Sequence, residues 1–530
     1  MNGADTAWVL ICAGLVLFMT PGLALFYGGM VPVRNVLTML MQNIIPLGII
    51  SVTWILVGYT LAFSNGGNSV LGEFDAFALI DVDTPQFHTV AAGVTIPTLA
   101  FVAYQMMFAV ITPALLTGAT AGRLRFAGWV VFLAAFSILV YPQVARWLWH
   151  PKGWLFQLGA QDWAGGMVVH ASAGAAAVAV LLVVGRRRGW PNLRTSPNNL
   201  PLMLVGGGIL WFGWFGFNAG DGLQANDIAA QALINTHVAG SAAMLTWLLV
   251  ERITRGHCTL VGAISGAVAG LATITPCAGY VGTGAALLIG LIAGCVCVVA
   301  VRLKSVLHYD DALDVIAVHF VGGVLGSFLL GFFGDSSVNP AGDDGIFSGG
   351  GGMLLWHQSV ALVSVVLFSF VLSWVIAAVI SRTIGLKEPG AEQEDLDRVQ
   401  QDSSAYSLSG ISARPTAAGR AAVDGSPGGD ARHSAPSHVI SALVNTERID
   451  GLRDALLMAG ARSLELSETA VYSGKIRSDT FRSEKRLIDF DERFRVQAAV
   501  DPEHEEAVVA VLKRFGAEPE SIYRMAIAPN

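Results

Sequence analysis

Long apolar runs dominate most of the chain. Runs of about 20 apolar residues recur between Trp8 and Ile380, and each is long enough to cross a hydrocarbon core of about 30 Å as a helix. We predict about eleven spans, at roughly 7–31, 36–63, 94–120, 126–146, 163–184, 200–219, 227–250, 258–277, 280–301, 311–334 and 352–381. The pattern therefore predicts an all-α polytopic protein embedded in a lipid bilayer.

Basic residues fall in alternate loops between these predicted spans. One set of loops carries Arg34, Arg123, Arg125, Arg186 to Arg188, Arg252, Arg255, Arg302, Lys304, Arg382 and Lys387. The opposite loops, 64–93, 220–226 and 335–351, contain neither Lys nor Arg. Because basic loops favour the cytoplasmic side, we predict a multi-pass cell membrane protein with its N-terminus outside and its C-terminus in the cytoplasm.

Two histidines occupy matching places in the two halves of this pattern. Spans one to five and six to ten form two halves, and an odd-numbered unit repeated in tandem must insert with opposite orientation, as a five-plus-five inverted repeat. His170 lies about eight residues from the outer end of span five, and His319 lies about eight residues from the inner end of span ten. Each is therefore about 12 Å deep, which leaves about 6 Å between their heights in the bilayer. The two imidazoles can meet.

An ionisable side chain at this depth indicates a function, because its charged form costs a few kcal/mol in the bilayer. A single buried histidine is more often one that bonds to the backbone. Two histidines at matching depths favour a permeation path for a species that can exchange a proton.

Composition changes the picture only beyond Lys387. The 530 residues are 53% hydrophobic and 13% charged, with a formal net charge of −7 that falls mostly in the last third. Residues 388–437 are rich in Ser, Gly, Ala, Pro and acidic groups, which is typical of a tail and flexible linker. We predict three parts: a membrane domain over 1–387, a cytoplasmic tail and linker over 388–437, and a globular domain over 438–530. We expect no nucleic-acid partner.

The globular domain reads as α+β. Strands are predicted from period-two alternation at 438–445, 461–472, 493–500 and 521–528, with a polar loop between the second and third. Thr446 can cap a helix that carries Ile449, Leu452, Leu456 and Ala459 on one face, and residues 502–515 are also helical. The order βαββαβ is that of a ferredoxin-like domain.

Four motifs stand out in the membrane region. They are Gly22-Leu-Ala-Leu-Phe-Tyr-Gly-Gly-Met30, Asp162-Trp-Ala-Gly-Gly-Met-Val-Val-His170-Ala-Ser-Ala-Gly, Trp211-Phe-Gly-Trp-Phe-Gly-Phe-Asn-Ala-Gly220 and Asp310-Asp-Ala-Leu-Asp-Val-Ile-Ala-Val-His319. Together they resemble the motifs of the ammonium transporter family (Amt/Mep/Rh), and the likeness covers about residues 5–385. The resemblance implies a homotrimer of eleven-helix subunits, each with a narrow apolar pore lined by His170 and His319.

The same resemblance assigns aromatic residues to the pore. Trp149 matches the residue that recruits ammonium outside by a cation–π contact, although an interfacial anchor is the ordinary role of such a tryptophan. Phe108 and Phe217 match the family's two stacked gate rings, and Phe108 also matches a residue of the external ammonium site. For both rings, ordinary packing in the core is the alternative role. Tyr104 and Trp214 are expected to support the pore beside them.

Three carboxylates complete the predicted site. Asp221 stands where many relatives have a serine that contacts the ion, so it either attracts ammonium more strongly or caps span seven. Asp162 opens span five, where it can accept amides of the first turn and add negative potential near the entrance. We expect Asp314 to do the corresponding job in the second half. No metal-ligand spacing is present, and neither a metal nor a cofactor is expected.

The C-terminal region carries weaker likenesses. The tail keeps Leu396-Asp397 and Ala405-Tyr406 of the family's regulatory C-terminus but has Gln401-Asp402-Ser403 in place of His-Gly-Glu, so coupling between subunits is not carried over. Residues 438–530 resemble the P-II nitrogen-signalling proteins through Asp450-Gly-Leu-Arg-Asp-Ala-Leu and Arg486-Leu-Ile-Asp-Phe490. Phe515-Gly-Ala-Glu-Pro-Glu replaces the glycine-rich nucleotide segment, so ATP binding is not carried over. A trimer-stabilising appendage is the alternative role.

These observations predict a transporter and not an enzyme. Ammonium would be recruited outside, lose a proton, pass as ammonia along the apolar pore and the histidine pair, and be regulated by the fused domain through a small molecule or protein. The alternative is an ammonium sensor that signals through the P-II-like domain with little or no transport.

Overall fold

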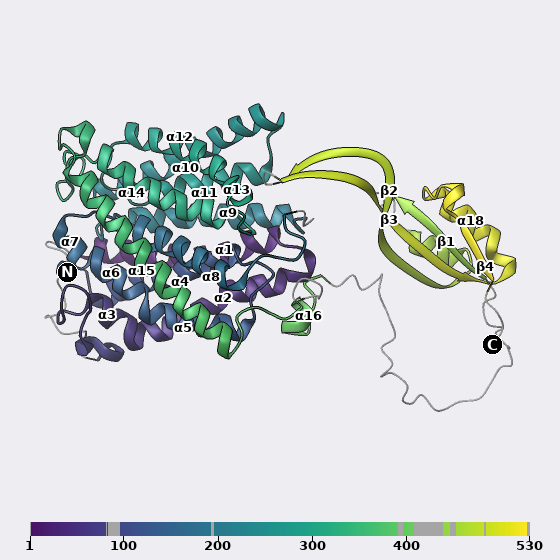
Figure 1. Cartoon of the computed structure of the whole chain (residues 1–530), viewed down its shortest axis with the longest axis horizontal. Coiled ribbons are helices and arrows are strands. Elements are labelled where there is room, and N and C mark those ends of the chain that lie inside the picture. The colour runs from purple at the N-terminus through teal and green to yellow at the C-terminus, as the bar shows by residue number, and fades with distance from the viewer. Residues whose placement is uncertain are drawn as a thin grey trace. The chain divides into compact units, whose positions relative to one another are not determined.

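The computed structural model of this chain describes residues 2–80, 82, 96–191, 196–390, 396–406, 438–445, 452–481 and 484–526 (Figure 1). The chain forms two compact units, Met1–Ala405 and Tyr406–Asn530. Each unit has a hydrophobic core of its own.

The first unit is a bundle of helices. Its first half contains α1 (Gly3–Met30), η1 (Val33–Asn35), α2 (Val36–Thr53), the π-helix η2 (Trp54–Gly58), α3 (Tyr59–Phe63), η3 (Phe74–Leu79), α4 (Thr98–Ala114), η5 (Leu115–Gly118), α5 (Phe126–Leu139), α6 (Tyr141–Trp149), α7 (Trp154–Leu158), the π-helix η6 (Gly166–Ala171) and α8 (Ser172–Val184). Its second half contains α9 (Leu200–Ala219), α10 (Asp227–Arg255), α11 (Leu260–Ile274), α12 (Thr283–Ala300), α13 (Leu303–Val306), the π-helix η7 (Ile316–Phe320), α14 (Val321–Phe333), η8 (Ile346–Ser348), α15 (Met353–Thr383) and α16 (Leu396–Gln401).

Ten helices of the described residues are apolar and long enough to cross a membrane. They correspond to the predicted spans except the eighth, where α11 has only 15 residues. A helix of that length rises about 22 Å, which is less than the core of about 30 Å. The helix ends at Ile274, two residues before Pro276, because proline has no amide hydrogen with which to continue the helical hydrogen bonds.

The predicted fourth span is divided. Val140 leaves the regular helical geometry between α5 and α6, and Pro142 lies at the start of α6. Proline lacks the N–H that would bond back into α5, so the helix ends before it and a new one begins. As a result α6 can turn Trp149 toward the site described below.

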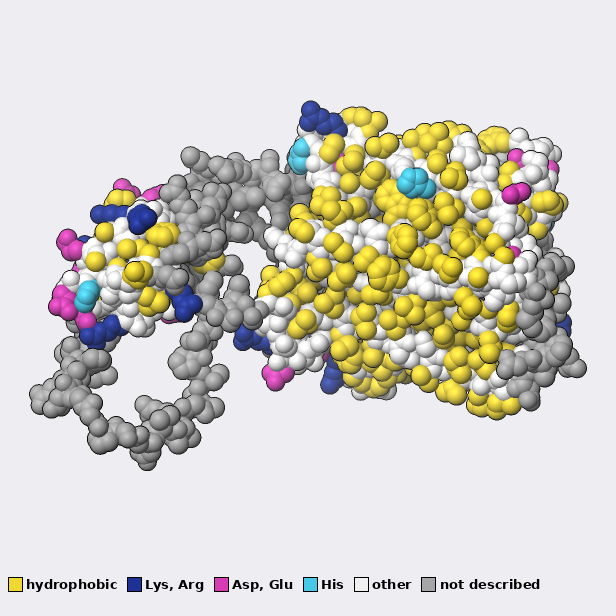
Figure 2. All heavy atoms as spheres, turned by 180° about the vertical axis from the view of Figure 1, so that it is seen from behind, with side chains coloured by type: hydrophobic (Ala, Val, Ile, Leu, Met, Phe, Trp, Pro, Cys, Tyr) yellow, Lys and Arg dark blue, Asp and Glu magenta, His cyan; other side chains and the backbone are white. Residues whose placement is uncertain are grey.

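Hydrophobic side chains cover the flank of the first unit, and charged side chains gather toward its two ends (Figure 2). Leu182 and Leu245 on this unit are each 62% exposed, and Val363 is 59% exposed. Apolar side chains this exposed are unfavourable in water and favourable against lipid chains. The surface therefore supports a multi-pass membrane protein.

The second unit is a four-stranded antiparallel sheet with two helices. Its elements are β1 (His438–Asn445), α17 (Leu452–Met458), β2 (Ala461–Phe481), β3 (Glu484–Val500), η10 (Pro502–His504), α18 (Glu505–Arg514), η11 (Pro519–Ser521) and β4 (Tyr523–Ala526). The strands lie in the order β2-β3-β1-β4. Alternate residues of β1, Ile440, Ala442 and Val444, are buried in the core of this unit. The predicted order of strands and helices is present, and Thr446 and Ile449 lie outside the described residues.

The loop predicted between the second and third strands is wrong. β2 and β3 pair from Ala461 with Val500 as far as Phe481 with Glu484, with a register shift near Tyr472 (Figure 1). Only the part of β3 from Arg493 to Val500 pairs with β1. Period-two alternation arises where one face of a strand is buried, so a ribbon beyond the sheet gives no such signal.

Candidate functional site

His170 and His319 meet inside the first unit. His170 is 1% exposed and His319 is 4% exposed. Their Nδ1 atoms are 3.3 Å apart, and their rings stack with centroids 5.3 Å apart at an angle of 18°. One nitrogen donates and the other accepts, so the two rings share one proton between them. The predicted meeting of the two imidazoles is confirmed.

Each histidine lies on a π-helix, which is rare and frequently marks functional sites. His170 belongs to η6 and His319 to η7, and an α-helix continues from each. Asp162 Oδ2 accepts hydrogen bonds from the amides of Met167 and Val168, both at 2.9 Å. The carboxylate satisfies amides at the start of η6 that have no partner within the helix, which supports the expected role of Asp162.

The corresponding residue of the second half is Asp311 and not Asp314. Asp311 Oδ2 accepts from the amide of Ile316 at 2.7 Å, five residues along the chain, as Asp162 does from Met167. Asp314 instead pairs with Lys304, with Nζ and Oδ1 3.0 Å apart. Asp314 also has a φ of 63°, so the chain turns there.

The helices that carry the histidines approach closely because glycine lines their contact. A Cβ atom on Gly323 of α14 would lie 2.6 Å from the carbonyl oxygen of Gly166 and 2.8 Å from Cβ of His170. Both distances are shorter than real contacts allow. Glycine at position 323 therefore permits the helix approach that brings the two imidazoles together.

Two phenylalanine rings cover the histidine pair. Phe108 and Phe217 have ring centroids 4.3 Å apart, and Phe217 stacks on His170 at 6.0 Å. The Tyr104 hydroxyl donates to the carbonyl oxygens of Gly216 and Phe217, which fixes the end of α9 that carries the ring. Trp214 stacks on His170 at 5.5 Å, and its Nε1 donates to Thr275 Oγ1. The structure thus brings the predicted gate and supporting residues to the histidines.

A narrow cavity follows the rings toward the histidines. It encloses about 10 Å³ and is lined by Met19, Leu23, Phe26, Ile111, Leu115, Val169, His170, Leu210, Trp214, Phe217, Val268 and His319. This volume is close to the smallest that holds one water molecule. His170 Nε2 is buried without a partner among the described residues. The lumen is therefore apolar except for imidazole nitrogen.

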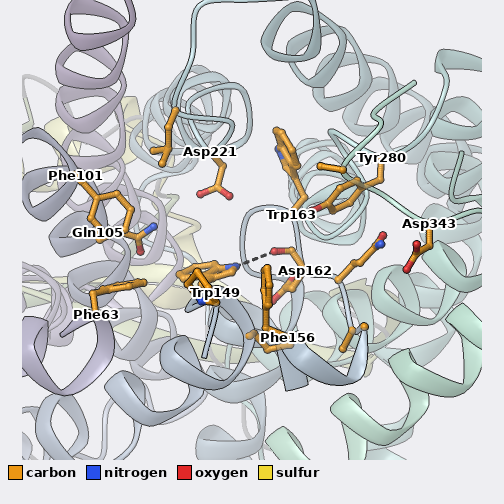
Figure 3. A pocket seen from close by; sticks show the side chains of 17 residues that line it. Phe63, Phe101, Gln105, Trp149, Phe156, Asp162, Trp163, Asp221, Tyr280 and Asp343 are labelled. Carbon is orange, nitrogen blue, oxygen red and sulfur yellow. Dashed lines mark hydrogen bonds between the residues drawn. The ribbon is translucent and has the colours of Figure 1, made fainter. Parts of the chain in front are cut away.

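A larger cavity lies on the other side of the rings, and we call it the vestibule (Figure 3). It encloses about 640 Å³ and is lined by Phe63, Phe101, Gln105, Leu148, Trp149, Pro151, Phe156, Gly159, Ala160, Gln161, Asp162, Trp163, Asp221, Leu223, Tyr280, Ala341 and Asp343. Aromatic rings and oxygen atoms dominate this lining, and the described part of it contains no Lys, Arg or His. Such a lining favours a cation.

Trp149 is held rigidly at the edge of the vestibule. Its Nε1 donates to the carbonyl oxygen of Asp162 at 2.8 Å, shown as a dashed line in Figure 3. Its ring meets Phe108 edge to face, with centroids 5.8 Å apart at 88°. Because its N–H is already bonded, the indole can offer a vestibule guest only its ring, as a cation–π contact requires.

Asp221 projects into the vestibule from the turn between α9 and α10 (Figure 3). The turn is closed by the amide of Leu223, which donates to Gly220 O at 2.9 Å. Asp221 does not cap α10, since that role belongs to Asn226, whose side chain accepts from the amide of Ala229. Burial, and secondly the charge of Asp162, raises the pKa of the Asp221 carboxyl well above its usual range.

The sequence patterns did not identify several vestibule residues. Gln105 precedes Phe108 by about one turn of α4. A polar residue in this apolar helix was the only sign in the sequence that Gln105 could belong to the site. Trp163 follows Asp162 and donates its Nε1 hydrogen to Asn218 O at 2.7 Å. Tyr280 and Asp343 come from the second half, and they reach the vestibule only through the fold.

One group of described residues outside the pore has metal-ligand spacing. Ligand atoms of Asp501, Glu503 and His504 lie within 4.8 Å of one another. The Asp501 carboxylate already pairs with the Arg462 guanidinium. That cation competes for the same oxygen atoms, so we assign no metal to this group.

Comparison with known proteins agrees with this geometry. A model described as Ammonium Transporter Family matches residues 7–406. The ammonium transporter of Bacillus subtilis is 43% identical over 408 residues, covering 77% of this chain and 99% of that protein. The crystal structure of Candida albicans Mep2 matches with a TM-score of 0.71 at 31% identity, over 77% of this chain and 94% of that one. A structure titled "Sensor Amt Protein" matches with a TM-score of 0.67 at 27% identity, over 75% and 96%.

The family match extends through the tail helix α16 and ends before β1. The second unit is identified by none of these matches. The first unit combines apolar helices, a buried histidine pair and a vestibule suited to a cation. The chain belongs to the ammonium transporter family, whose members are transport proteins and not enzymes.

Proposed function

We propose that ammonium enters the vestibule, loses a proton there, and crosses the pore as ammonia past His170 and His319. The contact between the two Nδ1 atoms directly below the phenylalanine rings carries this proposal. A neutral guest in the apolar lumen needs hydrogen-bond partners. Among the described residues that line the lumen, only His170 and His319 offer imidazole nitrogens for this purpose.

Selectivity follows from the proton and not from size. Ammonium and potassium have similar size and charge, so a charged filter separates them poorly. A bare cation in an apolar lumen loses its hydration without compensation, whereas ammonia loses little. Only a cation that can become neutral can then pass.

Recruitment at the vestibule rests on Trp149, Phe108 and Asp221. The indole and phenyl faces attract a cation through their ring electrons. The Asp221 carboxylate, when ionised, adds a negative charge to the vestibule lining where the cation waits. We propose that these three residues hold ammonium before it loses its proton.

Topology and assembly are part of the same proposal. We propose that α11 completes an eleventh span, so that two halves of five spans form an inverted repeat with the N-terminus outside. Arg146 and Lys152 lie on the proposed outer side, against the positive-inside pattern. Their side chains donate to backbone carbonyls of residues 62–68, so they serve the loop structure. A homotrimer remains the expected assembly.

The second unit is proposed to be a ferredoxin-like, P-II-like regulatory domain in the cytoplasm. Its order of elements and its strand order support the fold. A small molecule or a protein would bind this domain as the regulator, and we do not expect this domain to bind ATP. A trimer-stabilising appendage is the alternative for this unit.

An ammonium sensor is the second candidate function. The likeness to the sensor structure and the buried Asp221 carboxylate both favour tight binding. In that case ammonium would occupy the vestibule and move the second unit, with little or no transport.

Uptake of ¹⁵N-ammonium by proteoliposomes of the purified protein, measured beside calorimetric binding of ammonium, separates the two candidates. Transport predicts uptake by the wild type that vanishes in His170→Asp. Tight binding without uptake by the wild type would instead establish the sensor. Asp227→Asn, which removes an exposed outer carboxylate, is the matched control and should keep the uptake.

A further inference from the structure

Four oxygen atoms in the vestibule have no hydrogen-bond partner among the described residues. They are Gln105 Oε1, Gln161 Oε1, Asp162 Oδ1 and Asp221 Oδ1, and each atom is buried. Gln105 and Asp162 are each only 4% exposed as residues. All four atoms are hydrogen-bond acceptors. A guest that donates several hydrogen bonds is therefore required to satisfy these oxygen atoms.

Asp221 occupies a fixed position among these acceptors. A Cβ atom on Gly220 would lie 2.8 Å from Tyr104 Oη, and one on Gly222 would lie 3.1 Å from the Trp163 ring. The turn is therefore held between these two side chains. In Figure 3 the carboxylate points into the cavity between Gln105 and Trp163.

Among the described residues that line the vestibule with Asp221, none is cationic. Asp162 and Asp343 share the vestibule with it. Burial first, and then the charge of Asp221, raises the pKa of the Tyr280 hydroxyl. The hydroxyls of Tyr104 and Tyr141 also lie within range of the charge of Asp221. The ionised form of Asp221 therefore has no cationic partner in the described lining until ammonium arrives.

We propose that Asp221 is the base that takes the proton from ammonium in the vestibule. This inference rests on the proposed function and names the group that performs its first step. An N–H bond of ammonium breaks and its electron pair stays on nitrogen, while an O–H bond forms on the carboxylate. Ammonia then moves between Phe108 and Phe217, and the carboxyl group returns its proton to water in the vestibule.

Asp162 suits this role less well than Asp221. The Asp162 carboxylate holds the amides of Met167 and Val168, and protonation would weaken the start of η6. Burial raises the pKa of Asp162 to about 6, although these backbone amides oppose the rise. Asp221 Oδ1 has no partner among the described residues, so a proton can bind there without releasing the amides at the start of a helix.

The first test is uptake of ¹⁵N-ammonium by proteoliposomes. Asp221→Asn keeps an acceptor oxygen but is not a base, so its maximum rate should fall about 100-fold. Wild-type uptake should be lost as pH falls through the pKa of Asp221, because a protonated carboxyl cannot accept the proton, and the variant should lack this acid limb. Asp227→Asn should match the wild type. A variant with a raised KM but an unchanged maximum rate and pH profile would overturn the proposal.

The second test does not depend on transport. At alkaline pH, infrared difference spectroscopy should show a carboxylic-acid band when ammonium is added to the wild type. Potassium should not produce the band, and neither should ammonium with Asp221→Asn. A band without any uptake would refute the proposed transport and leave Asp221 as the base. Uptake without a band, or a band that persists in the variant, would refute the role of Asp221 and leave transport intact.

Discussion

At the scale of single residues, carboxylates and glycine place the histidine pair. Asp162 and Asp311 each hold an amide five residues further along the chain, and each precedes its histidine by eight residues. Gly323 then lets the two π-helices approach. The pair is thus built by residues that do not themselves face the lumen.

Removing either carboxylate should destabilise the first unit. Asp162→Ala and Asp311→Ala each leave buried amides without a partner, which costs about 1–3 kcal/mol. The melting temperature in detergent should fall by several degrees. The melting temperature of Asp162→Asn, which keeps an acceptor oxygen, should fall less. Melting temperatures of all three variants equal to that of the wild type would contradict the capping role.

Gly323→Ala should separate the histidines. The added methyl group would lie 2.8 Å from Cβ of His170, so α14 must move and the contact between the Nδ1 atoms must lengthen. Uptake of ammonium should fall at least tenfold, while Gly208→Ala should be neutral because nothing lies within 4 Å of its Cβ position. Wild-type uptake in Gly323→Ala would mean that the close approach is unnecessary.

The sequence predicted the residues of the site better than their partners. Hydropathy predicts the depth of His170 and His319, and this depth allows the two imidazoles to meet, as they do in the structure. It does not tell Asp311 from Asp314, because both lie near His319 and only the fold shows that Asp311 accepts from the amide of Ile316 while Asp314 pairs with Lys304. The vestibule position of Asp221 likewise depends on a turn held by Tyr104 and Trp163.

At the scale of elements, the tail helix α16 binds the start of α2. The Asp397 carboxylate, which is fully buried, accepts from the amides of Leu37 at 2.9 Å and Thr38 at 2.8 Å. These amides have no partner within α2, and a negative charge there also opposes the helix dipole. Gln401 donates to Leu37 O at 3.1 Å. Residues 396–405, predicted as part of a flexible tail, are thus ordered on the first unit.

Asp397→Ala should release this helix end. Hydrogen exchange at the amides of Leu37 and Thr38 should become faster, because both lose their acceptor. Asp402→Ala, in the same segment but exposed, should leave their exchange unchanged. Equal protection in Asp397→Ala and the wild type would show that α16 does not depend on this contact.

Elements were predicted where burial leaves a pattern and missed where it does not. The ten long apolar helices follow directly from hydropathy. The break at Val140 and the early end of α11 depend on Pro142 and Pro276, which the hydropathy pattern does not weigh. The long ribbon of β2 and β3 was missed because its outer part pairs with no third strand among those described.

At the scale of the whole molecule, the two units are built independently. The membrane unit keeps its core, its histidine pair and its vestibule within residues 2–405. The second unit has a separate core around β1 and its helices. The activity should therefore reside in the first unit and any regulation in the second.

A chain that ends at residue 406 should fold and transport. It retains every described residue of the pore and the contact of α16 with α2, so its melting temperature should match that of the membrane unit in the full chain. Uptake of ¹⁵N-ammonium should persist, although its rate can change if the second unit regulates it. Loss of folding or of all uptake would show that the second unit is needed for the pore.

The most direct test of the account compares ammonium with rubidium flux through the same wild-type proteoliposomes. Rubidium resembles ammonium in size and charge but has no proton to lose. The account predicts ammonium flux and a rubidium flux lower by about 100-fold or more, since an unneutralised charge in the apolar lumen costs a few kcal/mol. Rubidium flux equal to that of ammonium would show that the cation passes intact, and would contradict the account.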